Sequence, residues 1–324
     1  MTPGHKPPTA RTSTKRGRIA AVVLALSVLT TGLALPSAAG GATGIPAATS
    51  SIYEATASPA TLYRQGQSAG WAGSQGLVIL DFGRPAVVGT TAGTMDFGGS
   101  FVSLSAIAAG AESYIQGYFA SAPAHLQLDV AIGTNNSCGI GQPCGSTVCG
   151  CLNEPSSFTS WGADLASTIE AAQVQANAVR AHAGYTDVVT VMAGDDAEPA
   201  FDPGYQNTYD LLAGYANAVG GYSPAMVDYG TAEPGFWSSA QLTQVIDGFK
   251  PNLALPEIYF STDVTAWASV IAYAKAHGRT ITIFGVLANS PNGFNPSVSY
   301  SSLATAIRPI TGQSAFRWAS NITH

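Results

Sequence analysis

Short apolar segments alternate with longer segments of helical periodicity along most of the chain. Runs of apolar and β-branched residues predict buried strands at residues 77–83, 126–133, 188–192, 225–230, 253–260, 280–287 and 315–319. Between these runs, apolar residues recur at helical spacing, which predicts helices over residues 101–119, 157–183, 205–219, 239–249, 264–277 and 301–310. A regular alternation of strand and helix is typical of parallel βα units.

This alternation predicts the α/β class and, more specifically, a (β/α) TIM-type barrel that forms a single domain over residues 62–320. Only six or seven strands are recognisable. We therefore expect one or two of the eight strands of a barrel to be irregular, and the stretch from Leu62 to Trp71 is a candidate for one of them. An open, doubly wound sheet is the alternative architecture.

The first 39 residues have the pattern of a secretory signal peptide. Basic residues within 15–18 precede an apolar run from Ile19 to Leu35, and small residues at 36–40 supply a cleavage site. An uncleaved membrane anchor is the alternative, because the run approaches spanning length. We expect an exported chain that is secreted and extracellular. Residues 40–61, rich in Ala, Thr, Ser and Pro, are expected to be a flexible lead-in.

The charge of the chain excludes two classes of partner. The sequence has 13 basic and 19 acidic residues, and removal of residues 1–39 takes away five of the basic ones, which leaves a net charge of −11. Nucleic acids and anionic membranes bind clustered cations, so we expect neither as a partner. We expect a monomer that uses no cofactor.

Four cysteines lie within fourteen residues, at Cys138, Cys144, Cys149 and Cys151. In an exported protein, an even number of cysteines in one loop predicts disulfide bonds, so we expect the loop 138–151 to be held by them. Cys149 and Cys151 are too close to pair comfortably with each other. A zinc site of four thiolates is the alternative, although the spacing lacks the usual paired knuckles.

Acidic residues are concentrated where the predicted strands end. The buried run Val188–Met192 leads into Asp195, Asp196 and Glu198, and Pro199 prevents a simple continuation of the strand. Four other predicted strands contain or precede a carboxylate, at Asp81, Asp129, Asp228 and Glu257. Because sites in α/β proteins are built at the carboxyl ends of parallel strands, we expect these acids to meet there.

Side-chain alternation indicates which acids share a side of their strand. Asp129 is expected to point into the barrel, and Asp196 and Glu198 share a side that Asp195 opposes. Single acids such as Asp81 or Asp228 can equally be structural residues that accept hydrogen bonds from a loop, and for Asp195 the structural role is favoured. Asp129 and Glu257 lie inside apolar runs, where a buried acid is costly without partners.

Clustered carboxylates suit cleavage of glycosidic bonds, in which one acid stays protonated and another stays ionised. The predicted catalytic residues are Glu198, Asp196, Glu257 and Asp129. The four histidines that follow the expected signal peptide lie before a strand, at helix ends or at the C-terminus, and the motifs of serine hydrolases, zinc proteases and nucleotide-binding proteins are absent. We expect no metal; a divalent cation held by Asp195, Asp196 or Asp129 is the alternative.

Aromatic and polar residues after the strands are candidates for substrate binding. Sugar rings stack their apolar faces on aromatic side chains, and Phe236 and Trp237 follow the fourth predicted strand. The alternative for Trp237 is that it opens the next helix and packs in the core. The predicted substrate-binding residues are Asp81, Asn135, Asp228, Tyr259 and Trp237.

The segment Asp196-Ala197-Glu198 resembles the D-x-E motif of (β/α)-barrel glycoside hydrolases such as chitinase-like and lysozyme-like enzymes. The resemblance implies that Glu198 is the general acid and that Asp196 assists it or the substrate. Glu257-Ile258-Tyr259 loosely resembles a later-strand acid and tyrosine of the same barrels. The fuller D-x-x-D-x-D-x-E run is absent, and the acidic strand is the third predicted strand rather than the fourth.

We therefore expect a secreted glycoside hydrolase-like protein that cleaves a polysaccharide or oligosaccharide by carboxylate acid/base chemistry. A non-catalytic carbohydrate-binding or cell-surface scaffold barrel is the alternative, because the same architecture serves both purposes.

Overall fold

The computed structural model describes residues 44–123, 126–135, 155–183, 188–199, 204–219, 224–249, 252–290 and 292–323. The expected signal peptide and the four cysteines of the loop 138–151 lie outside the described residues. Gly44–His324 forms one compact unit. Among the described helices, none combines the length and the apolar character that a membrane crossing requires.

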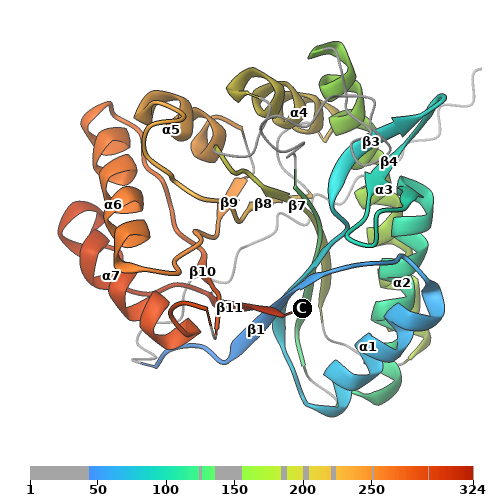
Figure 1. Ribbon diagram of the computed structural model, residues 1–324. Coiled ribbons are helices and arrows are strands. Elements are labelled where there is room, and N and C mark those ends of the chain that lie inside the picture. The colour runs from blue at the N-terminus through green and yellow to red at the C-terminus, as the bar shows by residue number, and fades with distance from the viewer. Residues whose placement is uncertain are drawn as a thin grey trace, which may run out of the picture. The chain divides into compact units, whose positions relative to one another are not determined.

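Eight parallel strands form the central sheet, as predicted for a (β/α) barrel (Figure 1). They are β1 (Ala48–Tyr53), β2 (Gly76–Asp81), β6 (Leu128–Asn135), β7 (Val189–Asp196), β8 (Met226–Asp228), β9 (Asn252–Ala254), β10 (Gly285–Ala288) and β11 (Trp318–Thr323). The strand order is β10-β11-β1-β2-β6-β7-β8-β9, and all paired neighbours are parallel. Isolated bridges Ala254–Ile283 and Glu257–Leu287 join β9 to β10, so the barrel is nearly closed.

Seven helices connect successive barrel strands and lie around the outside of the sheet (Figure 1). They are α1 (Pro59–Trp71), α2 (Leu104–Ser121), α3 (Pro155–His182), α4 (Tyr205–Ala218), α5 (Ser239–Asp247), α6 (Ser261–Ala276) and α7 (Pro296–Thr311). A small antiparallel sheet of β3 (Arg84–Val88), β4 (Thr91–Met95) and β5 (Phe101–Ser103) is inserted between β2 and α2.

The helix starts follow from capping residues. Ser238 precedes α5 and forms a capping box with Gln241, in which each side chain bonds the other residue's backbone N–H. The side chains of Ser103 and Asn295 accept backbone N–H bonds at the starts of α2 and α7. Gly312 ends α7 in the left-handed conformation, with φ 81°, that glycine adopts without steric cost.

The segment expected as a flexible lead-in contains the first barrel strand. β1 runs from Ala48 to Tyr53 and pairs with β2 and β11, whereas the stretch from Leu62 to Trp71 lies in α1. The residues of β1 are Ala-Thr-Ser-Ser-Ile-Tyr, so β1 lacks the apolar run that marks the other strands. One of its buried polar side chains is satisfied by a hydrogen bond across to β11, in which Thr49 Oγ1 and Ser320 Oγ are 2.7 Å apart. The barrel therefore begins before residue 62.

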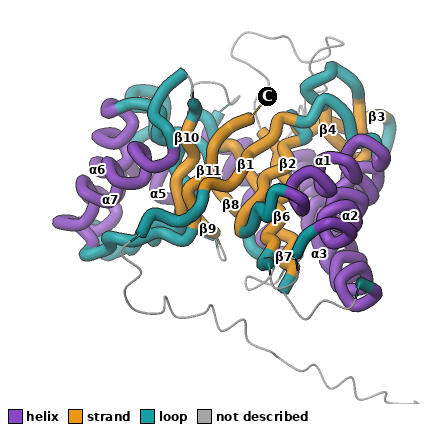
Figure 2. The backbone as a smooth tube through the Cα atoms, turned by 90° about the horizontal axis from the view of Figure 1, so that it is seen from below, coloured by secondary structure: helices purple, strands orange, loops and turns teal. Residues whose placement is uncertain are grey.

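Two separate apolar clusters lie on the two faces of the barrel wall. The larger lies between sheet and helices and includes Val130 and Val191. The smaller fills the barrel interior and includes Ala131, Met192 and Tyr229. Successive residues of one strand thus alternate between the clusters, as the pleat requires. Figure 2 shows β10, β11, β1, β2 and β6 side by side, with helices flanking the strands.

An ion pair lies near the amino ends of the strands. Arg317 Nη2 donates to Asp129 Oδ2 at 2.7 Å, and the Arg317 guanidinium lies 4.9 Å from the centre of the Trp318 ring. The Asp129 side chain is only 2% exposed. A carboxylate buried this fully is stable because a cation accompanies it.

Replacing Arg317 by Met is expected to lower the free energy of unfolding at neutral pH by about 2–4 kcal/mol, because Asp129 then stays buried without its cation. Urea unfolding followed by circular dichroism measures the change. Arg308→Met is the matched control, since Arg308 lies exposed in the last turn of α7 and its loss is expected to cost less than about 0.5 kcal/mol. Equal effects of the two substitutions would contradict a stabilising role for the ion pair.

Candidate active site

Three of the four predicted catalytic acids meet at the carboxyl end of the barrel. Asp196 is the last residue of β7, Glu198 follows two residues later, and Glu257 follows β9. One carboxylate oxygen from each lies within 4.8 Å of the others. Asp196 and Glu257 are buried, and Glu198 is half-buried. The backbone of Glu257 is held by its N–H, which donates to the Gly230 carbonyl at 3.1 Å.

The position of Asp196 follows from the alternation along β7. Met192 belongs to the interior cluster, and Val191 and Ala193 belong to the cluster under the helices. Asp196 has the parity of Met192 and so lies on the interior side, and Asp195 lies on the helix side, opposite Asp196 as predicted. With β1 included, β7 is the fourth barrel strand rather than the third.

Tyr229 lies inside the barrel and bonds a further acid that ends β2. Its hydroxyl donates to Asp81 Oδ2 at 2.8 Å, and Gly83 N–H donates to Asp81 Oδ1 at 2.8 Å. The ring fits because Gly133 and Gly194 have no side chain. A Cβ at Gly133 would lie 2.4 Å from the Tyr229 hydroxyl, and a Cβ at Gly194 would lie 2.8 Å from ring atom Cε1. Tyr229 was not predicted from the sequence, because the acid that precedes it, Asp228, was chosen as the substrate-binding residue of this strand.

Two further tyrosines, Tyr259 and Tyr53, interact with the three clustered acids. The hydroxyl of Tyr259 donates to Glu257 Oε1, which brings that predicted pair together. Tyr53 of β1 pairs in register with Asp81, and burial and the charges of Asp196 and Glu257 raise the pKa of Tyr53 far above its usual range. The Tyr53 ring stacks on Phe97 at 4.6 Å between centroids, and Phe97 is 42% exposed. Tyr53 was missed because it lies in the segment assigned as lead-in.

Burial and mutual repulsion shift the carboxyl groups toward their protonated forms. Burial, and then the charges of Glu257 and Glu198, raise the pKa of Asp196 well above its usual value. Burial and the charge of Glu198 do the same to the pKa of Glu257, although the Tyr259 hydrogen bond acts in the opposite direction. Burial and the charge of Glu233 raise the pKa of Glu198 to about 7. The cluster therefore holds protons at neutral pH.

Asp129 does not belong to this cluster. It pairs in register with Leu77 of β2, whereas Asp81 pairs with Gly133. Asp129 thus lies four residues nearer the amino end of β6 than the level of Asp81, a separation of about 13 Å along the strand. It bonds Arg317 there, so its assignment as a catalytic residue is wrong. Its inward direction was predicted, but its level along the strand was not.

Asp228 lies on the other face of the barrel wall. It shares a side of β8 with Met226, which packs in the cluster under the helices. Its register partner is Asp195 of β7, which has the same orientation. Among the described residues, no hydrogen-bond partner is found for either oxygen of Asp195 or for Asp228 Oδ2. The structure therefore does not bring Asp228 to the substrate side of the site.

The remaining predicted binding residues have separate outcomes. Trp237 is only 7% exposed and packs edge-on against Tyr205 at 5.9 Å between ring centroids, so it lies in the core under the helices rather than facing the acids. Asn135 ends β6 in register with Asp196, and its side chain lies outside what the structure describes.

The three clustered carboxylates could also hold a metal ion. Asp196, Glu198 and Glu257 each offer one oxygen, and no nitrogen or sulfur ligand accompanies them in this described group. An all-oxygen donor set of this kind suits hard cations such as Ca²⁺ or Mg²⁺ rather than Zn²⁺.

Comparisons with known proteins add little to this geometry. No family model and no curated protein matches the chain. This chain is similar to a crystal structure of a candidate alpha-L-fucosidase from Bacteroides thetaiotaomicron VPI-5482. The similarity covers 86% of this chain and 85% of that chain, with a TM-score of 0.40 and 11% sequence identity. A likeness this distant carries no argument about activity. The fold and the site define a (β/α)-barrel protein with a carboxylate cluster at its carboxyl end.

The buried acids predict a protein that is more stable at mildly acidic than at neutral pH. Burial raises the pKa of Glu54, Asp81 and Asp228 to about 7. Between about pH 4 and pH 7 the folded state therefore binds protons that the unfolded chain has released. The stability from these groups is complete below pH 4 and is lost as the pH rises through about 7.

We therefore expect the thermal unfolding midpoint to increase as the pH is lowered from about 8 to about 5. Differential scanning calorimetry measures it. Burial, and then the charge of Asp228, also raise the pKa of Asp195 well above its usual value. The double substitution Asp195→Asn with Asp228→Asn therefore removes two of the titrating groups and is expected to flatten the dependence. A midpoint that is highest above pH 8 would show that these acids are ionised in the folded protein.

Proposed function

We propose that this protein is a secreted glycoside hydrolase that cleaves a polysaccharide or oligosaccharide. The observation that carries the proposal is the approach of Asp196, Glu198 and Glu257 to within 4.8 Å at the carboxyl end of a (β/α) barrel. Cleavage of a glycosidic bond needs one carboxyl group that holds a proton and another that is ionised. The export pattern of residues 1–39 supports secretion and therefore an extracellular substrate.

Glu198 is the acid/base. It is the least buried of the three acids, and its pKa of about 7 lets it occur in both protonation states near neutral pH. Glu257 is the nucleophile and reacts once it has lost its proton; the hydrogen bond from Tyr259 favours this ionised form and so opposes the rise of its pKa that burial causes. Asp196 lies against both and has an oxygen, Oδ1, for which the described residues supply no hydrogen-bond partner. Its neutral form is therefore favoured, and it can donate a proton to the substrate or to a neighbouring carboxylate.

The short separation of the acids favours a two-step, retaining mechanism. Retaining enzymes place their carboxyl groups about 5–5.5 Å apart, and inverting enzymes place them about 6.5–9.5 Å apart. In the first step Glu198 gives its proton to the glycosidic oxygen as the bond to the anomeric carbon breaks, and a Glu257 oxygen bonds to that carbon. In the second step Glu198 takes a proton from water, and the water oxygen replaces Glu257.

Aromatic residues next to the acids supply a surface for a sugar ring. Phe97 is exposed and stacks on Tyr53, whose hydroxyl lies in the field of the clustered carboxylates. The backbone N–H of Phe97 donates to the Glu54 carbonyl at 3.2 Å, which holds the backbone of Phe97 against the residue that follows β1. An exposed aromatic ring in this position can orient the apolar face of a sugar.

Glu198→Gln is expected to lower the rate of hydrolysis by at least about 100-fold, because the amide neither donates nor accepts the catalytic proton. Release of reducing ends from a panel of polysaccharides measures the rate, and binding to the same polysaccharides is expected to persist. Asp129→Asn is the control, since Asp129 lies at the amino end of the barrel, and it is expected to keep the wild-type rate.

An unchanged rate in Glu198→Gln would overturn the assignment of the acid/base. If the wild-type protein binds a polysaccharide but releases no reducing ends over long incubation, the protein is a non-catalytic carbohydrate-binding barrel. Activity that disappears with a chelator and returns with Ca²⁺ or Mg²⁺ would assign the three carboxylates to a cation instead.

Tyr259→Phe is expected to shift the acidic limb of the pH–rate profile to higher pH. The lost hydrogen bond favoured ionised Glu257, so its removal raises the pKa of the nucleophile, which must be ionised to react. The dependence of kcat/KM on pH measures this limb. The alkaline limb, which reports Glu198, is expected to stay near pH 7; an acidic limb that does not move would contradict the assignment of Glu257.

A further inference from the structure

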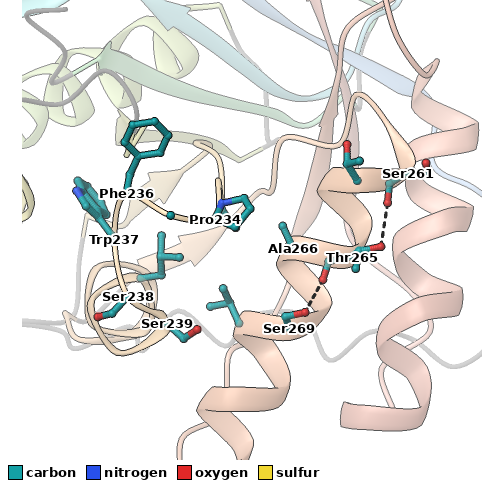
Figure 3. A pocket seen from close by; sticks show the side chains of 14 residues that line it. Pro234, Phe236, Trp237, Ser238, Ser239, Ser261, Thr265, Ala266 and Ser269 are labelled. Carbon is teal, nitrogen blue, oxygen red and sulfur yellow. Dashed lines mark hydrogen bonds between the residues drawn. The ribbon is translucent and has the colours of Figure 1, made fainter. Parts of the chain in front are cut away.

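A groove without charged side chains lies on the outer layer of the barrel between α5 and α6. Its volume is about 800 Å³, and none of the residues that line it is Asp, Glu, Lys, Arg or His. Figure 3 shows Pro234, Phe236 and Trp237 on the loop after β8, and Ser261, Thr265 and Ser269 on α6 opposite. The groove therefore has one aromatic wall and one hydroxyl-bearing wall.

Phe236 is presented to solvent by a rigid turn. It is 54% exposed, whereas its neighbour Trp237 is buried and packs against Tyr205. An isolated bridge joins Pro234 to Trp237, and Gly235 allows the turn with a φ of 99°. An exposed aromatic ring on a fixed turn, next to a groove, is typical of a ligand-binding surface.

The hydroxyl groups of the opposite wall are arranged to accept hydrogen bonds. Thr265 Oγ1 donates to the Ser261 carbonyl at 3.1 Å, and Ser269 Oγ donates to the Thr265 carbonyl at 2.8 Å. Because these protons are used within α6, the exposed hydroxyl oxygens keep their lone pairs for donors on a ligand. A ligand that fits has many hydroxyl donors, an apolar face for Phe236 and no charge, which describes a neutral sugar chain.

The loop that forms the aromatic wall also contacts the acid cluster. Thr231 N–H donates to the Ala197 carbonyl at 3.1 Å, between Asp196 and Glu198, and Glu257 N–H donates to the Gly230 carbonyl. Glu233 follows, and its charge is the strongest one that acts on Glu198. A single segment, residues 230–237, therefore runs from the carboxylates to the groove.

We propose that this groove is an accessory binding site for a neutral stretch of polysaccharide that extends away from the catalytic acids. The inference rests on the proposed function for the identity of the substrate. It assigns the groove to sugar binding through stacking on Phe236 and hydrogen bonds to the hydroxyls of α6.

Affinity electrophoresis in native gels tests the proposal. The purified protein is run through gels that contain hydroxyethyl cellulose, laminarin, dextran or galactomannan, with carboxymethyl cellulose as an acidic counterpart. At least one neutral polysaccharide is expected to retard the wild-type protein. Phe236→Ala is expected to weaken that binding about fivefold or more, the size of a lost stacking contact. Thr265→Asp, which adds a charge to the opposite wall, is expected to weaken it as well.

Trp71→Ala is the matched control, because Trp71 is a 69% exposed aromatic at the end of α1, far from the groove in sequence and on another helix. It is expected to bind like the wild type, and the thermal midpoints of all variants verify folding. No retardation by any neutral polysaccharide, or equal retardation of Phe236→Ala and Trp71→Ala, would overturn the proposal.

The experiment separates this inference from the proposed function. Retardation that depends on Phe236, in a protein that releases no reducing ends, supports the groove and refutes the hydrolase. Hydrolysis that responds to Glu198→Gln, with retardation that is the same in Phe236→Ala and wild type, supports the hydrolase and refutes the groove.

Discussion

Burial of carboxyl groups with few hydrogen-bond donors is the constraint on which the rest of this structure depends. An ionised carboxylate is expensive to remove from water unless a cation or several donors accompany it. Asp129 has Arg317 as a partner, but the acids at the carboxyl end have no described cation within bonding distance. They therefore remain stable by holding protons, which is also the property that acid catalysis requires.

The interior packing preserves this arrangement. Tyr229 crosses the barrel above Gly133 and Gly194 and reaches Asp81, so one side chain both fills space and stabilises an acid. A side chain at either glycine would collide with the ring. The glycines of β6 and β7 are thus explained by the Tyr229 phenol, which must cross the interior to reach the carboxyl group of Asp81. Packing and electrostatics are linked through this one residue.

The barrel and most of its helices could be predicted from the sequence, because apolar periodicity reports which face of each element is buried. β1 could not, since its interior side is occupied by Thr49 and Ser51 rather than by apolar residues. The strand-end acids Asp196, Glu198 and Glu257 were predictable as a group. Tyr53 and Tyr229 were not, because their role depends on contacts between strands that are distant in the sequence.

The errors at Asp129 and Asp228 have a shared physical origin. Alternation shows which residues of one strand lie on the same face. It fixes neither how far along the barrel axis a residue lies nor whether its face points to the interior or to the helices. Strand register supplies the level, and it places Asp129 at the amino end. Packing supplies the face: Met226 lies under the helices, so Asp228 does too, and Tyr229 turns inward.

The segment after β8 shows what this geometry achieves. Because Asp228 faces outward, the chain can turn at Gly230, where a Cβ would lie 2.0 Å from the Ala197 carbonyl oxygen. That close approach brings Thr231 N–H onto the same carbonyl and fixes the loop against the residue between Asp196 and Glu198. The loop then carries Phe236 to the outer groove. One short segment therefore contacts both the residue between the two acids and, through Phe236, the outer groove.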